Sequence, residues 1–236
     1  MRTKLRKALA AIGIVMIVLV VVAGILVGIY LSKGVDGLLS IPGVTALLGL
    51  EHPKDLQMGD IEAADRDSLL DKLGADPTSW PNVVVGSPTR SVTVSLTAKE
   101  AAALLSSGRG PDYFYDIQVA PKGPGLLAIS GMMKVDGALA LADMKRADVE
   151  GMVGALPDEV PIYAEIQLAP ADGSLGITIR QLRIGAVLVP GSSLGVDAAT
   201  MDLYTRKFFL QAYGIGLQSI MTDGTLITVE MDVPTT

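Results

Sequence analysis

The sequence predicts an α+β fold, in which an N-terminal transmembrane helix is followed by a curved antiparallel β-sheet wrapped around a long C-terminal helix. The first observation is a run of 25 residues without a charge, Ala8–Ser32. The second is a series of alternating apolar and polar segments separated by turn residues, which is typical of antiparallel strands. The third is a broadly apolar helical pattern from 197 to 213, and we expect this helix to cover the apolar face of the sheet.

The composition excludes several kinds of chemistry. The chain has 236 residues, no Cys and one His. Disulfides, thiolate metal sites and Cys nucleophiles are therefore excluded, and one His cannot build a multi-histidine metal site. We expect neither a metal nor a cofactor.

The uncharged run 8–32 is long enough to cross a bilayer, which takes roughly 20 helical residues. Four basic residues precede the run, whereas Lys33 follows it and is soon joined by Asp36. This asymmetry predicts a cytoplasmic N-terminus and a single-pass protein of the cytoplasmic membrane. A cleaved signal peptide is the alternative. Its apolar region has only about 7–15 residues, however, and residues 27–31 contain no clear cleavage site.

The part of the chain beyond the membrane is acidic. Five of the 19 Lys and Arg precede Gly34 and none of the 25 Asp and Glu does, which leaves 14 basic against 25 acidic side chains, a net charge of −11. Such a charge argues against binding to nucleic acid or electrostatic adhesion to anionic lipid headgroups. Its simplest consequence is solubility of the ectodomain.

Three parts of the chain can be distinguished. Residues 1–33 are the cytoplasmic tip and the transmembrane helix, 34–88 form a juxtamembrane segment with a short helix and a linker, and 89–236 form the extracytoplasmic α+β domain. The short helix is predicted at 60–74 because acidic residues come first, a Lys comes late and Gly74 ends it. The apolar stretch 34–55 is interrupted by Gly and Pro, and we expect it to pack on the domain rather than on the bilayer surface.

The domain begins with an alternating strand at 92–96. Thr97 and Glu100 then have the spacing of a capping box, which predicts a helix that ends near Ser106. The next two alternating segments, 113–119 and 125–135, are separated by a Pro- and Gly-rich turn and are expected to form an antiparallel hairpin.

Further elements are predicted from turn residues and periodicity. Asp136-Gly137 is expected to turn the chain into a strand at 138–141. Apolar residues between 144 and 156 have helical spacing. The remaining strands are expected at 162–168 and 175–184, which form a second long hairpin, and at 225–233.

Two motifs that resemble catalytic or nucleotide-binding signatures are rejected. Residues 191–195 match G-x-S-x-G, but a nucleophile elbow needs a His that follows the Ser, and the only His is His52, far upstream. His52 itself is expected to be an ordinary juxtamembrane polar residue. Gly214-Ile215-Gly216 lacks the third glycine and the preceding strand of a dinucleotide fingerprint. We therefore expect that the protein is not an enzyme.

The order of elements over residues 90 to 233 resembles a known family. The most specific pieces are the strand end IGAVLVP at 184–190 and the final strand DGTLITV at 223–229. In these two segments the chain resembles the YpmS-like and LmeA-like single-pass envelope proteins of the tubular lipid-binding type. The resemblance implies a bacterial envelope protein that holds lipid tails in an apolar tunnel and performs no covalent chemistry.

Seven residues are predicted to line this apolar site, because they alternate toward the helix or lie on its apolar arc: Leu127, Ile129, Met133, Ile177, Ile179, Tyr204 and Phe208. The expected partners are membrane lipids, whose acyl chains would be bound or transferred. The alternative is that these side chains fill a solid core. The protein would then be a membrane-tethered interaction or structural subunit that docks on other envelope proteins.

Overall fold

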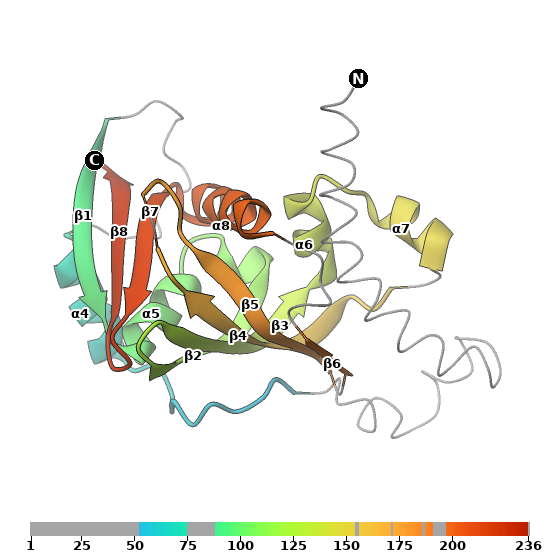
Figure 1. The fold of residues 1–236 in the computed structure, drawn as a ribbon, viewed down its shortest axis with the longest axis horizontal. Helices are drawn as coiled ribbons and strands as arrows, with labels where there is room; N and C mark the ends of the chain where they lie inside the picture. Colours follow the sequence, from blue (N-terminus) through green and yellow to red (C-terminus); the bar gives the residue numbers. More distant parts are fainter. Residues whose placement is uncertain are drawn as a thin grey trace.

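The structure, a computed structural model, describes residues 52–74, 88–153, 156–170, 172–185, 187–190 and 197–235. Its elements in chain order are α4 (Ala63–Leu73), β1 (Thr89–Leu96), α5 (Ala98–Leu105), the short 3-10 helix η2 (Gly110–Asp112), β2 (Phe114–Gly123), β3 (Leu126–Lys134), α6 (Val135–Leu141), α7 (Arg146–Val153), β4 (Glu159–Leu168), β5 (Ile177–Ile184), β6 (Val187–Pro190), α8 (Ala198–Tyr213), β7 (Gly216–Thr222) and β8 (Ile227–Pro234) (Figure 1).

The strands form two antiparallel sheets. The larger sheet has five strands in the order β2-β3-β4-β5-β6, and the smaller has three in the order β1-β8-β7. A bridge between Pro124 and Asp223 joins the β2–β3 turn to the β7–β8 turn. The Gly125 N–H also donates to the Thr222 carbonyl at 2.8 Å. The two sheets are therefore tied together at their turns (Figure 1).

Buried apolar residues form two clusters. The main cluster joins the two sheets and takes side chains from α4, α5 and α8, among them Leu73, Leu104 and Phe209. The second cluster lies under α6 and α7 and contains Met133, Val135, Leu139, Val149, Leu156, Val160, Leu182 and Ile184. The inner face of the five-stranded sheet contributes to both clusters.

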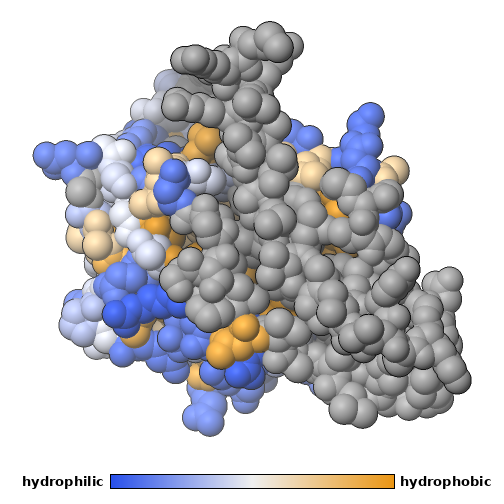
Figure 2. Space-filling model, turned by 45° about the vertical axis from the view of Figure 1, so that its right-hand side comes forward, coloured by the Kyte–Doolittle hydropathy of each residue, from blue (hydrophilic) through white to orange (hydrophobic). Residues whose placement is uncertain are grey.

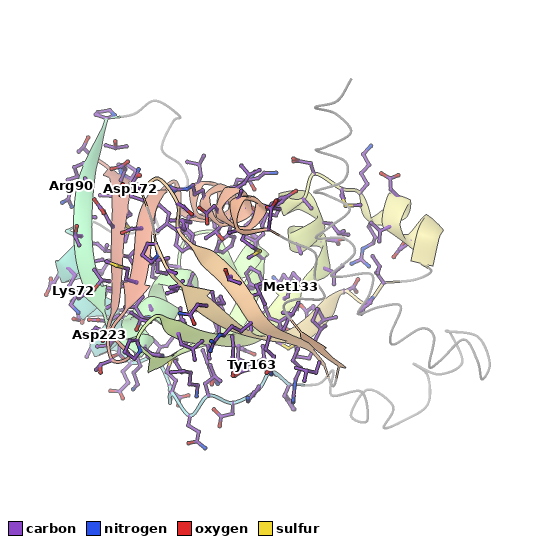
Figure 3. All side chains as sticks on the ribbon, viewed as in Figure 1. Lys72, Arg90, Met133, Tyr163, Asp172 and Asp223 are labelled. Carbon is purple, nitrogen blue, oxygen red and sulfur yellow. The ribbon has the colours of Figure 1, made fainter. Side chains whose placement is uncertain are left out.

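The outer face of the five-stranded sheet carries the chain that leads into α4. The Lys54 ammonium lies 3.8 Å from the centre of the Tyr163 ring, and the Leu56 N–H donates to the Gln118 side chain at 2.6 Å. Figure 3 shows Tyr163 beside this segment. Residues 52–61 therefore pack along the sheet, whereas residues 34–51 of the predicted juxtamembrane segment lie outside the described residues.

The predicted fold class is wrong in its architecture. The structure has two sheets rather than one curved sheet, and α8 is not wrapped by either: it packs against β5 of one sheet and β7 of the other. The strands divide into two sheets because the first and last strands of the domain pair with each other. Strand β1 pairs with β8 over its whole length, from Thr89 with Pro234 to Leu96 with Ile227. This pairing separates β1, β7 and β8 from the other strands.

The predicted transmembrane helix at 8–32 lies outside the described residues. No helix in the part of the chain that the structure describes is long and apolar enough to cross a membrane.

Most of the locally specified elements are confirmed. The capping box is present, because the Glu100 N–H donates to Thr97 Oγ1 at 3.2 Å and the Thr97 N–H donates to Glu100 Oε2 at 2.7 Å. The short acidic helix is α4, ended by Gly74 in the left-handed conformation with φ 65°. The predicted antiparallel hairpins are β2–β3 and β4–β5.

The predicted turn at Asp136-Gly137 and the strand after it are wrong, because both fall within α6. Val135 and Leu139 lie one turn apart and are both buried, which favours a helix here. Gly137 serves close packing rather than a turn. A Cβ at this position would lie only 2.5 Å from the Asp112 carbonyl oxygen.

Candidate functional site

A line of half-buried apolar side chains crosses the inner face of the five-stranded sheet where the two clusters meet. We call this line the seam and define it as Ile129 of β3, Ala164 and Ile166 of β4, and Ile179 of β5. Ile129 is the cross-strand partner of Ala164, and Ile166 is the partner of Ile179. Ile129 and Ile166 pack against the main cluster, whereas Ala164 and Ile179 pack against the second.

The structure divides the predicted lining residues into two groups. Leu127, Met133 and Ile177 are buried, with exposed fractions of 3%, 8% and 5%. Ile129, Ile179, Tyr204 and Phe208 are half-buried. The first group fills the two clusters, and the second lies on the seam or on α8.

The helix α8 is positioned by two polar side chains. Asp202 accepts hydrogen bonds from the Ser174 hydroxyl and from the Leu175 N–H, both at 2.7 Å, and so holds α8 to the loop between β4 and β5. One turn later on α8, the Arg206 guanidinium donates to the Leu217 carbonyl at the start of β7. These contacts fix the register of α8 relative to both sheets.

Phe208 lies at the centre of a group of aromatic rings. Its ring makes edge-to-face contacts with Tyr113 at 5.4 Å and with Phe114 at 5.6 Å between centroids. Phe114 packs against both clusters, so Phe208 and Phe114 mark the place on α8 and β2 where the clusters adjoin. Edge-to-face pairs of this kind contribute about 1 kcal/mol each beyond burial.

A polar group lies beside these rings, where α8 meets the turn between α6 and α7. Lys207 Nζ donates to the Leu141 carbonyl at 2.6 Å and to Asp143 Oδ2 at 2.9 Å. Tyr204, one turn earlier on α8, has a raised pKa because of its burial and the nearby Asp143 charge. An amine and a phenol therefore lie next to an otherwise apolar region.

Sequence reasoning missed Lys207, Asp143 and Asp202. The available signal was the presence of Asp202, Arg206 and Lys207 within a helix whose other residues are mostly apolar. Charged residues in such a helix must find partners or water, but the sequence does not reveal that the partners come from the turn at Asp143 and from the loop at Ser174.

The other motifs provide no second site. His52 is exposed, and the motif at 191–195 lies outside the described residues. Among the residues that the structure describes, no group of three or more His, Asp or Glu side chains could hold a metal ion.

Four large apolar side chains are exposed on the surface of the described part of the chain. Leu188, Leu203, Leu210 and Met221 are the exposed ones among the described residues. On the face shown in Figure 2, hydrophobic residues of the described part appear as separate patches between hydrophilic ones. Scattered apolar residues are ordinary on protein surfaces, so the seam remains the best candidate site.

Comparisons of this chain with protein-family models, with curated proteins and with solved structures found no match.

Proposed function

We propose that the protein binds the acyl chains of membrane lipids along the seam, without covalent chemistry. The observation that carries this proposal is the row of half-buried aliphatic side chains at Ile129, Ala164, Ile166 and Ile179, between two buried clusters on one sheet face. An acyl chain against this row would remove further apolar surface from water, at about 0.8 kcal/mol for each buried CH₂.

The proposal includes attachment to the cytoplasmic membrane. The uncharged segment 8–32 supports attachment, and the basic residues before it support a cytoplasmic N-terminus with the domain outside. A domain held at the membrane surface in this way would exchange lipid with the adjacent bilayer of the cell envelope.

The tight burial of Leu127, Met133 and Ile177 favours a second candidate. Here the domain is fully packed and acts as a membrane-tethered interaction or structural subunit. The two candidates differ in whether lipid contacts the seam.

Photo-crosslinking separates the two candidates. The full-length chain would be reconstituted in phosphatidylcholine vesicles that contain a phosphatidylcholine with a diazirine near the end of one acyl chain. Crosslinked peptides would then be identified by mass spectrometry. We expect labelling in peptides that contain Ile129, Ile166 and Ile179, as well as in 8–32. Labelling confined to 8–32 would contradict acyl-chain binding and favour the interaction subunit.

Substitution of a seam residue tests the assigned face. We expect Ile179→Trp to lower labelling of the β3 and β4 peptides about tenfold, because the larger ring occupies space equivalent to at least two methylenes of a bound chain. Ile179→Val keeps the shape and is the matched control, and thermal unfolding followed by circular dichroism verifies that both variants fold. Equal labelling of the two variants would show that lipid does not contact this face.

A further inference from the structure

Lys207 stands out because it is fixed in place next to the region where the two clusters adjoin. It directly precedes Phe208, whose ring contacts Phe114. Its ammonium group bonds to the Leu141 carbonyl. Leu141 packs against the main cluster, and Met144, three residues later, packs against the second. The turn between α6 and α7 therefore spans both clusters, and Figure 1 shows α6 beside α8.

The partner of Lys207 is held much less firmly than Lys207 itself. The Lys207 side chain is 24% exposed, whereas the Asp143 side chain is 85% exposed. An ion pair with such an exposed member contributes little to stability. An ammonium group has three donors, so the Leu141 carbonyl can retain the amine while another anion replaces the Asp143 carboxylate.

The neighbouring basic residue does not have this freedom. Arg206 donates to the Leu217 carbonyl and, more weakly, to the carbonyls of Gly173 and Gln218 at 3.4 and 3.5 Å. The N–H groups of its guanidinium thus donate to backbone carbonyl oxygens. Lys207 is thus the basic group on α8 whose counter-ion is exchangeable.

We propose that Lys207 binds the anionic headgroup of an amphiphile whose acyl chain lies along the seam. This inference rests on the proposed function and narrows its ligand class to amphiphiles with a carboxylate or phosphate head. Asp143 occupies the headgroup position when no ligand is bound. Tyr204 remains a protonated phenol at neutral pH and offers a second donor near the same position.

The turn that carries Asp143 is secured independently of Lys207. Arg146, at the start of α7, bonds to Asp136 at 2.7 Å and to the Leu156 carbonyl at 2.9 Å, and it lies 3.1 Å from Asp158. Removing the Asp143 charge therefore leaves α6 and α7 in place and changes only the competition for Lys207.

The test compares two photoreactive probes that differ only in charge. One is a long-chain fatty acid with a diazirine in its chain, and the other is its methyl ester. Each is added at low concentration to the full-length chain in phosphatidylcholine vesicles at pH 8, where the acid is ionised. Labelling of the β3, β4, β5 and α8 peptides is normalised to labelling of 8–32.

In the wild-type chain we expect the acid to label these peptides several-fold more than the ester. Lys207→Met should lower labelling by the acid about tenfold and leave the ester unchanged, because a charge-assisted hydrogen bond is lost. Lys207→Arg retains the charge and should retain most of the preference. Asp143→Asn should raise labelling by the acid about threefold, because a competing exposed carboxylate is removed.

An increase for Asp143→Asn that is confined to the acid cannot arise from unfolding, because unfolding would expose the apolar strands to acid and ester alike. This variant therefore keeps the test decisive even if Lys207→Met misfolds. Equal labelling by acid and ester in the wild-type chain, unchanged in Asp143→Asn, would overturn the headgroup assignment and leave acyl-chain binding standing. Absence of labelling on these strands with either probe would overturn acyl-chain binding itself.

Discussion

Gly176→Ala should lower the free energy of unfolding by more than about 4 kcal/mol, because two independent costs add at this position. Gly176 has φ +60°, which is unfavourable for a residue with a Cβ. A Cβ here would also overlap the Ala169 carbonyl oxygen and lie 2.8 Å from the Pro170 nitrogen. These are backbone atoms and cannot rotate away. In a chain of this length the loss corresponds to a fall in the melting temperature of about 10 °C.

The chain offers a matched control for this substitution three residues earlier. Gly173 has φ +75°, and a Cβ there would have no atom within 4 Å. Gly173→Ala therefore carries only the cost of the left-handed conformation, about 1–2 kcal/mol. Thermal unfolding followed by circular dichroism would compare the two variants. Equal losses would mean that the contact with Ala169 is relieved by a small movement of the loop and that only the backbone conformation matters.

The Gly176 substitution also bears on the site. The loop before β5 bonds to Asp202 of α8 through Ser174 and Leu175, and β5 pairs Ile179 with Ile166. A displaced loop would shift α8 relative to the seam. We therefore expect acyl-chain labelling to fall in Gly176→Ala even below the temperature at which the domain unfolds.

The elements that could be predicted from the sequence are those specified by local contacts. The capping box of α5 depends on two residues three positions apart, Thr97 and Glu100. The left-handed cap of α4 depends on Gly74, which follows the last turn. Short-range geometry of this kind is independent of the rest of the fold.

The sheet arrangement could not be predicted, because it depends on pairing between distant segments. Thr89 near the start of the domain is the partner of Pro234 near its end, and no local pattern indicates that pairing. The strand β7 was missed for a different reason. A register shift between Leu217 and Ser219 interrupts its alternation, so its apolar residues do not keep a period of two.

The candidate site was predicted only in part. Alternation correctly grouped Ile129 and Ile179 on the face that α8 approaches, but the same pattern holds for Leu127 and Ile177, which are buried. Periodicity predicts on which face of a strand a side chain lies, but not how deeply that side chain is buried. Asp143 and Lys207 are 64 residues apart in sequence, so their contact depends on the tertiary fold.

Glu100→Gln is expected to lower the free energy of unfolding by about 2–3 kcal/mol at neutral pH, because the amide NH₂ that replaces one carboxylate oxygen cannot accept the hydrogen bonds that the buried, charged carboxylate accepts. The Glu100 side chain is only 3% exposed. Its carboxylate accepts hydrogen bonds from Lys72 Nζ at 2.6 Å, from the Ser68 hydroxyl at 2.5 Å and from the Thr97 N–H. These contacts hold α4 against α5, and Figure 3 shows Lys72 at that edge of the molecule.

The lowered pKa of Glu100 makes the expected loss of stability depend on pH. Burial alone raises the pKa, but the bonds from Lys72, Ser68 and Thr97 outweigh it and lower the pKa from 4.5 to about 2. A lowered pKa means that the stabilisation is complete above pH 4.5 and is lost as the pH falls toward 2. The glutamine variant has no such titration. The stability difference between the wild type and Glu100→Gln should therefore shrink over this range.

Chemical denaturation at pH 7 and at pH 2.5 measures that difference directly. Asp112→Asn is the control, because Asp112 pairs with Arg109 at 2.9 Å while both side chains are more than half exposed, at 57% and 59%. An exposed pair contributes at most about 1 kcal/mol, so its removal should produce a small change at either pH. If the loss in Glu100→Gln were the same at both pH values, the effect would arise from altered packing of the amide rather than from the charge. The charged carboxylate would then not be what holds α4, and with it residues 52–61, against the domain.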